Sequence, residues 1–147
     1  MTEAGIAAAE RMGAYLREAG LLPDLVLVSP ARRTRETFEA AERAAKAEMN
    51  ACYEPAIYGA GSAVLCALIA HTPADVKTLL MVGHNPGLAE AAVALAGEGK
   101  RSELARMRRH FPAPCLAVLD FKAKYWDEAR VGKGRLDRFV TQDSLAD

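Results

Sequence analysis

The sequence predicts an α/β sandwich of three layers, in which a mostly parallel β-sheet is flanked by helices. One observation is the uninterrupted apolar run Leu25–Val28, because a strand without polar alternation is typical of a parallel sheet buried on both faces. The other is that such runs alternate with segments whose apolar residues recur at helical spacing. A chain that alternates strand and helix favours a parallel sheet covered by helices.

The first helix is predicted to begin after Thr2, a good N-cap residue, and to end at Gly20. Its apolar residues recur at helical spacing: Ile6, Ala9, Gly13 and Leu16. Pro23 and Asp24 then form a turn into the strand at 25–28.

A second helix is predicted over residues 31–47 and a third from Ser62, with a short extended piece between them at 53–58. The helix-breaking segment 71–75 contains a proline and precedes a strand at 78–82. The middle of the chain thus repeats the order of strand and helix.

A fourth helix is predicted over 86–95, because Pro86 suits a first helical position, and the glycines at 97–99 close it. A short basic helix follows at 102–109. Two further strands are expected at 115–121 and 135–140, separated by a glycine-containing loop.

Composition narrows the classes of function. The 147 residues carry nineteen basic and nineteen acidic side chains, so no net field attracts nucleic acid or a membrane surface. We expect residues 1–147 to form a single cytoplasmic domain, since no signal peptide or membrane-spanning run is visible. No spacing among the three cysteines indicates a metal or redox site, and we expect buried, reduced thiols: Cys52, Cys66 and Cys115.

A local basic run stands out from this balance: Lys100, Arg101, Arg106, Arg108 and Arg109. Such a run is usually a solvated helix face. Contact with an acidic partner is the alternative.

Two strand-to-helix junctions carry the candidate functional residues, because ligands of open α/β sheets bind where the loops at the strand carboxyl ends converge. At the first junction, Ser29 and Pro30 follow the strand, and Arg33 comes three residues later. Ser29 can simply be an N-cap and Pro30 the first helical residue. Alternatively, the helix N-terminus and Arg33 together hold a tetrahedral anion.

The second junction places His84, Asn85 and Pro86 directly after the strand at 78–82 and Gly83. Asn85 can cap the next helix, and His84 can satisfy a nearby carbonyl group. At a strand carboxyl end, however, the imidazole can also donate a hydrogen bond to a phosphoryl oxygen. Two junctions of the same kind favour a phosphoryl site.

In this order, the junction motifs resemble those of the histidine phosphatase superfamily, the phosphoglycerate-mutase-like fold. The motifs are Ser29-Pro30-x-x-Arg33-x-x-Glu36-Thr37 and Val82-Gly83-His84-Asn85-Pro86. The length and spacing most resemble the SixA-like branch of phosphohistidine phosphatases. Further segments similar to that branch are Thr2-Glu3-Ala4-Gly5, Tyr58-Gly59-Ala60 and Phe111-Pro112.

The resemblance implies a covalent mechanism that needs neither a cofactor nor a metal. Family members attack a phosphoryl group with a histidine, and water then hydrolyses the phosphohistidine intermediate. Two arginines and a second histidine stabilise the phosphoryl oxygens. By position, the resemblance implies that Arg33 is the second arginine and His84 the second histidine, both catalytic, with Ser29 at the rim of the phosphate-binding pocket.

The chain departs from the family at the nucleophile. The family's nucleophile and first arginine lie in an Arg-His-Gly or Arg-His-Ala motif at the end of the first strand, and neither triplet occurs in this sequence. His71 lies in the 71–75 segment, and His110 follows no apolar strand, so neither is a good replacement. The chain as it stands is therefore expected to lack phosphoryl-transfer activity.

The missing first strand is expected to lie between the strands at 25–28 and 78–82, so that the domain is N-terminally incomplete. Two apolar strand edges without partners would be an aggregation hazard. The sheet must therefore close up, borrow a strand from a second copy in a strand-sharing homo-oligomer, or depend on residues outside this sequence.

Three functions remain open. The first is a phosphatase acting on phosphohistidine of a partner protein, or on a small phosphoester, with a nucleophile that this chain lacks. The second is a non-catalytic phosphoryl-binding relative, and the third is an interaction domain whose junctions are only helix starts. The first is favoured because Arg33 and His84 remain in register with their strands. Glu54 is a candidate proton donor by its neighbourhood alone, and a surface role is the alternative.

Overall fold

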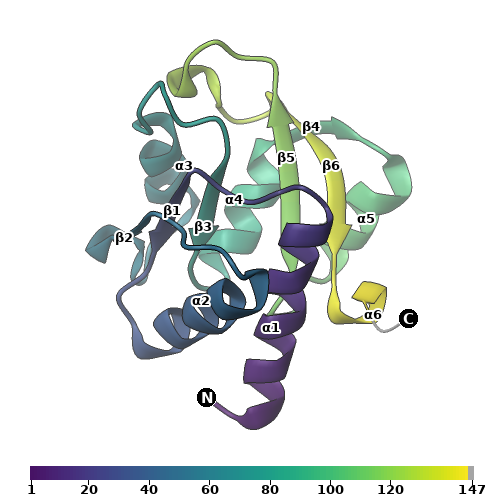
Figure 1. The fold of residues 1–147 in the computed structure, drawn as a ribbon. Helices are drawn as coiled ribbons and strands as arrows, with labels where there is room; N and C mark the ends of the chain where they lie inside the picture. The colour runs from purple at the N-terminus through teal and green to yellow at the C-terminus, as the bar shows by residue number, and fades with distance from the viewer. Residues whose placement is uncertain (146–147) are drawn as a thin grey trace. The chain divides into compact units, whose positions relative to one another are not determined.

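A computed structural model describes residues 1–145 of the chain. These residues form two compact units that alternate along the sequence. The first unit contains residues 1–58 and 76–84 and the segment that begins at Gln142, and the second contains residues 59–75 and 85–141. Figure 1 labels the elements that make up the two units.

The first unit is a three-stranded parallel sheet with helices packed beside it. Its strands, in the order β2-β1-β3, are β1 (Leu25–Val28), β2 (Ala51–Tyr53) and β3 (Leu79–Val82). Its helices are α1 (Glu3–Glu18), α2 (Arg32–Ala45), the 3-10 turn η1 (Pro55–Ile57) and the short α6 (Gln142–Leu145). Val26 and Val28 of the central strand are fully buried and pack with Phe38 of α2, so the sheet's core lies at β1.

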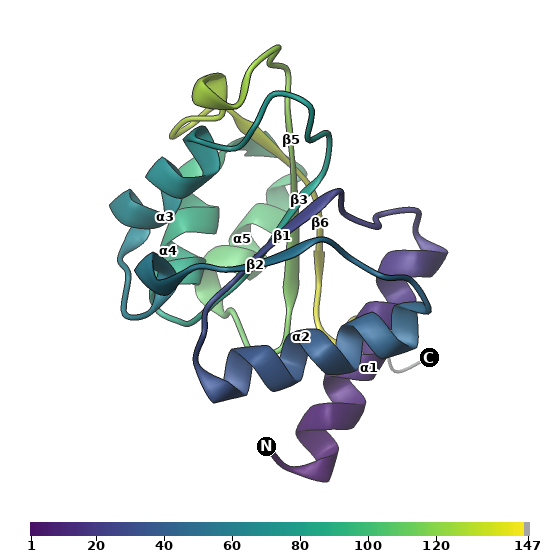
Figure 2. The ribbon, with the colours of Figure 1, turned by 60° about the vertical axis from the view of Figure 1, so that its left-hand side comes forward.

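The pairing of α1 with α2 depends on a residue without a side chain. A Cβ atom at Gly13 of α1 would lie 2.0 Å from the carbonyl oxygen of Ala41 in α2. The two helices can approach this closely only because Gly13 has no Cβ atom. Figure 2 shows α1 and α2 side by side.

The second unit is a mixed three-stranded sheet with the strand order β4-β6-β5. Its strands are β4 (Ala96–Gly99), β5 (Leu116–Phe121) and β6 (Gly134–Val140), and β6 is parallel to β4 and antiparallel to β5. Its helices are α3 (Ser62–Ala70), α4 (Gly87–Leu95), α5 (Arg101–Arg109) and the 3-10 turn η2 (Trp126–Glu128).

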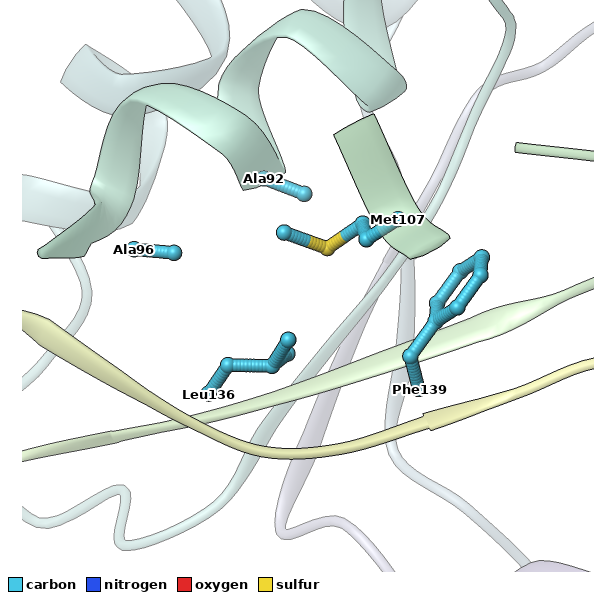
Figure 3. Close-up of a cluster of buried hydrophobic side chains, with 5 residues drawn as sticks. All are labelled: Ala92, Ala96, Met107, Leu136 and Phe139. Atoms are coloured by element: carbon cyan, nitrogen blue, oxygen red, sulfur yellow. The ribbon is translucent and has the colours of Figure 1, made fainter. Parts of the chain in front are cut away.

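Helices and strands of the second unit enclose its own apolar core. Figure 3 shows Ala92, Ala96, Met107, Leu136 and Phe139 facing one another, from α4, β4, α5 and β6. Met107 is 1% exposed, so this long, flexible side chain fills the space between the helices and the sheet.

The predicted class, a mixed α/β fold with a parallel sheet flanked by helices, is confirmed. The position predicted for the missing strand is wrong. β1 and β3 are hydrogen-bonded directly to each other, in register from Leu25 opposite Leu79 to Val28 opposite Val82, which leaves no space for a strand between them. The outer edge of β3, in contrast, is paired with no strand among residues 1–145.

Two further expectations need correction. The glycine-rich segment predicted only to close a helix forms β4, because β6 offers it a partner. The cysteines are free thiols in the described residues, but none is fully buried: Cys52 is exposed, and Cys66 and Cys115 are half-buried. Cys52 lies on β2, the edge strand of its sheet, where its neighbours leave it uncovered. Within the described part of the chain, no helix is both long and apolar enough to cross a membrane.

Candidate functional site

The three strands of the first unit end at the same level, which brings the residues that follow them together. The Ser29 backbone N–H donates to the Val82 carbonyl oxygen at 3.0 Å, and the Glu54 N–H donates to the Val28 carbonyl oxygen at 2.8 Å. Because parallel strands present all their carboxyl ends at one edge of a sheet, the two junctions predicted from sequence converge there.

Ser29 and His84 are in direct contact at this edge. Ser29 Oγ lies 2.7 Å from His84 Nε2, and Ser29 is 0% exposed. The structure therefore joins two side chains that are 55 positions apart in the chain. The alternative that His84 only satisfies a nearby carbonyl group is not borne out, because its hydrogen-bond partner among the described residues is the Ser29 hydroxyl group.

Ser29 is also not the N-cap of α2. The N-cap is Ala31, and the helix begins at Arg32. The hydroxyl group of Ser29 instead accepts a weak hydrogen bond from the Ala31 N–H at 3.4 Å and faces His84. The N-cap interpretation fails because the side chain has a partner, His84, in the loop that follows the neighbouring strand β3, which local sequence does not reveal.

Thr34 supports this junction and was not predicted as a site residue. Its side chain is 4% exposed, and its Oγ1 lies 2.8 Å from the Ser29 carbonyl oxygen and 2.9 Å from that of Ala31. The hydroxyl group thus ties the first turn of α2 to the loop that carries Ser29. The only sequence signal was a threonine in the first helical turn after a Ser-Pro pair.

Arg33 lies in the first turn of α2 and is exposed. Its neighbours are engaged: Arg32 Nε donates to Glu36 Oε1 at 2.8 Å, and the Arg35 guanidinium lies 5.5 Å from the centre of the Tyr53 ring. Among residues 1–145, no hydrogen bond or ion pair holds the Arg33 guanidinium, and none joins it to Ser29 or His84. Arg33 is therefore a cation available to a ligand near a helix N-terminus.

Tyr58, which the sequence indicates only as part of a turn, adds an aromatic side chain beside His84. Its ring centre lies 5.7 Å from that of His84, at an angle of 85° between the ring planes. Such an edge-to-face arrangement is favourable for aromatic pairs. Tyr58 is 69% exposed, so it covers one side of the imidazole and still faces solvent.

The remaining candidates have structural partners. Glu54 Oε2 accepts from the Ala56 N–H at 3.1 Å and caps η1. In the second unit, Asn85 Oδ1 accepts from the Ala89 N–H at 3.3 Å, but the N-cap of α4 is Pro86 and the helix begins at Gly87, so the expectation that Asn85 caps the helix and Pro86 starts it is wrong by one position. His71, at the end of α3, lies with Nδ1 2.7 Å from the Ala67 carbonyl oxygen.

The site as a whole offers hydrogen-bond donors and positive charge. Within the described residues, no group of three or more His, Cys, Asp or Glu side chains could hold a metal ion. An imidazole, a free guanidinium and a helix N-terminus are instead the groups that proteins use to bind oxyanions.

Comparison with known sequences gives relatives over almost the whole chain. No protein-family model matches. An uncharacterized chloroplastic protein of Arabidopsis thaliana is 28% identical over 98% of this chain and 68% of its own length. An uncharacterized protein of Mycobacterium tuberculosis is 33% identical over 92% of this chain and 84% of its own length.

Solved structures also match almost the whole chain, and the names of these proteins state an activity. A protein of Nakamurella multipartita, provisionally named phosphohistidine phosphatase SixA, has a TM-score of 0.80 at 28% identity, over 96% of this chain and 83% of its own. Its counterpart from Agrobacterium tumefaciens has a TM-score of 0.78 at 32% identity, over 96% and 82%. A protein histidine phosphatase SixA bound to tungstate shares the fold, with a TM-score of 0.72 at 22% identity over 99% and 85%.

Proposed function

Because this chain belongs to the histidine phosphatase superfamily, in its SixA-like branch, we propose that it forms the phosphoryl-binding part of a phosphohistidine phosphatase. The observation that carries the proposal is the 2.7 Å contact between Ser29 and His84 at the carboxyl ends of two paired strands. A third group, the Arg33 guanidinium, which has no hydrogen-bond or ion-pair partner among the described residues, lies on the helix that follows the first of these strands.

The substrate is a phosphohistidine side chain on a partner protein, with a small phosphoester as the alternative. Arg33 supplies charge-assisted hydrogen bonds to the phosphoryl oxygens. His84 donates a further hydrogen bond where negative charge increases during transfer. Glu54, at the same edge of the sheet, remains the candidate proton donor for the leaving group.

The nucleophile comes from outside this chain as printed, because no Arg-His-Gly or Arg-His-Ala triplet is present. The outer edge of β3 offers a place for the strand that would carry it. A strand added there in parallel would end beside Gly83 and His84, since parallel neighbours share their carboxyl-end level. The strand is supplied either by a further segment of the natural protein or by a second copy in a strand-sharing homo-oligomer.

A second function, phosphoryl binding without catalysis, is favoured by the absence of an Arg-His-Gly or Arg-His-Ala triplet from the sequence. Without a nucleophile at the site, Arg33 and His84 can still bind a phosphoryl group together. The protein would then bind a phosphorylated partner without removing its phosphoryl group.

The protein isolated from its own cells distinguishes these functions. We expect an intact mass above that of the printed chain, or a stable association of copies, together with hydrolysis of a phosphohistidine-containing protein. Substituting His84→Ala in the same protein should abolish most of that hydrolysis. A mass equal to that of the printed chain, a monomer and no hydrolysis would refute the phosphatase and leave phosphoryl binding.

A further inference from the structure

We propose that Ser29 is a positioning residue that holds the proton of the neutral His84 imidazole on Nδ1. This inference goes beyond the proposed function, and only its consequence for ligand binding depends on that function. It replaces the expected place of Ser29 among the phosphate-binding residues. Ser29 carries one buried hydroxyl group, whose hydrogen-bonding capacity is limited.

The Ser29 hydroxyl group has two polar neighbours. A backbone N–H can only donate, so Ser29 Oγ accepts from Ala31 at 3.4 Å. The second neighbour is His84 Nε2 at 2.7 Å. A serine hydroxyl group donates one hydrogen bond and accepts up to two, so its own hydrogen atom still needs an acceptor.

His84 Nε2 is the acceptor that the structure offers. Ser29 is 0% exposed, so its hydroxyl hydrogen cannot be satisfied by bulk water. If Nε2 carried a proton and donated to Oγ, the serine hydrogen would be buried without a partner, which costs roughly 1–3 kcal/mol. The satisfied arrangement has Ser29 donating to an unprotonated Nε2, which leaves the ring proton on Nδ1.

Two neighbouring side chains limit movement of this pair. Thr34 Oγ1 lies 2.8 Å from the Ser29 carbonyl oxygen, which restrains the backbone that carries the hydroxyl group. The Tyr58 ring meets the His84 ring at 85°, which restrains its rotation. Among residues 1–145, no hydrogen bond engages His84 Nδ1. The Nδ1–H group is thus the one that is free to donate to an oxyanion.

Nitrogen NMR of the ¹⁵N-histidine-labelled chain tests the assignment without any ligand. At about pH 8, above the ordinary histidine pKa of about 6.5, long-range ¹H–¹⁵N spectra distinguish protonated from unprotonated ring nitrogens. His71→Gln and His110→Gln variants identify the signals, since the chain has three histidines. We expect a protonated Nδ1 and an unprotonated Nε2 in His84. A protonated Nε2 in the unsubstituted chain would overturn the proposal.

Substitution at Ser29 tests the cause. Ser29→Ala should shift part of the His84 population to the Nε2–H form and weaken binding of inorganic phosphate by about fivefold. Ser29→Cys keeps a weak donor and should restore part of the Nδ1–H population. Thr37→Val is the matched control, because it removes the 2.9 Å bond to the Arg33 carbonyl oxygen on the same helix and should change neither spectrum nor affinity. An unaltered His84 spectrum in folded Ser29→Ala would contradict the proposal.

The two proposals can fail separately. A chain with the Nδ1–H form that binds no phosphate would retain the tautomer assignment and refute the proposed phosphoryl site. If Ser29→Ala does not fold, the spectrum of the unsubstituted chain still decides the assignment.

Discussion

Arg32 and Arg33, two adjacent arginines at the start of α2, differ in whether an acidic side chain pairs with them. Arg32 forms an ion pair with Glu36, whereas the guanidinium of Arg33 is exposed and has no partner in the described part of the chain. We expect Arg33→Ala to weaken phosphate binding by about tenfold or more, because hydrogen bonds to charged groups contribute about 1.5–3 kcal/mol. Isothermal titration calorimetry measures the loss. Arg32→Ala, with the same change in net charge, should lower the affinity much less, and equal losses would argue against a specific role for Arg33.

The three thiols differ in burial, which predicts an order of alkylation. Burial raises the pKa of Cys115 to about 12 and also raises that of Cys66, whereas Cys52 is exposed. Because the thiolate is the reactive form, a raised pKa leaves Cys115 protonated and unreactive at pH 8. Mass spectrometry after iodoacetamide treatment should find Cys52 modified first and Cys115 modified only on unfolding. Early modification of Cys115 in the folded protein would contradict the shielding of this thiol from solvent.

At the residue scale, the sequence indicates the candidate side chains but not the contacts that they make. Arg33 and His84 were predicted because an arginine and a histidine that follow apolar strands are recognisable locally. The partner of Ser29 was not predictable, since it lies 55 positions away and depends on which strands become neighbours. Thr34 was missed because nothing local shows that its hydroxyl group is buried.

Among the secondary-structure elements, α1 and α2 provide a sharp test of packing. Gly13→Ala would place a Cβ atom 2.0 Å from a backbone oxygen of α2, so the helices must separate. We expect a loss of about 1–3 kcal/mol in the free energy of unfolding, as for other overpacked sites, measured by urea denaturation. Gly5→Ala in the same helix meets mainly the flexible Met1 side chain and should cause no comparable loss. Equal stability of both variants would contradict the close approach.

Asp24 joins the beginnings of β1 and β3. Its carboxylate accepts from the backbone N–H groups of Lys77 and Thr78, both at 2.9 Å. These bonds lower the pKa of Asp24 below its ordinary value of 3.8. A lowered pKa in the folded state stabilises the protein above pH about 4, and this stabilisation is lost as the pH falls through the folded-state pKa.

Thermal melting of Asp24→Asn should show this dependence. We expect a lower Tm than that of the unsubstituted chain at pH 7, with the difference shrinking as the pH falls below 3.8 and through the lowered folded-state pKa of Asp24. Asp75→Asn, at an exposed position, serves as the control. A difference that is independent of pH would mean that the carboxylate charge does not matter.

Most elements were predictable because their apolar periodicity and their capping residues are local signals. Thr2 accepts from the Gly5 N–H at 3.0 Å as the N-cap of α1, as expected. β4 was not predictable, since Gly97 and Gly99 indicate a turn and the strand exists only through its pairing with β6. The exposure of Cys52 follows from the position of β2 at a sheet edge, which is also a long-range property.

For the whole chain, strand order was the least predictable feature. Apolar runs identify strands, but nothing in Leu25–Val28 or its partner run states that the two are direct neighbours. The missing strand was therefore assigned to the wrong place, and the strand edges expected to lack partners were also wrong. In the structure, β1 and β3 pair directly with each other, and among residues 1–145 the outer edge of β3 has no partner strand.

The candidate site lies wholly within the first unit, and this predicts that stability and ligand binding can be separated. Met107→Ala creates a cavity in the core of the second unit (Figure 3) and should cost about 2–5 kcal/mol in the free energy of unfolding. The phosphate affinity of the remaining folded protein should be unchanged. Urea denaturation and calorimetry measure the two quantities, and a parallel loss of affinity would show that the site depends on that core.

The most direct test of the phosphoryl site is a titration of the ¹⁵N-labelled chain with inorganic phosphate, followed by backbone NMR. We expect saturable chemical-shift changes at residues 29–35 and at His84, which are lost in both Arg33→Ala and His84→Ala. No saturable change, or changes confined to other parts of the chain, would contradict the assignment of Arg33 and His84 to an oxyanion site.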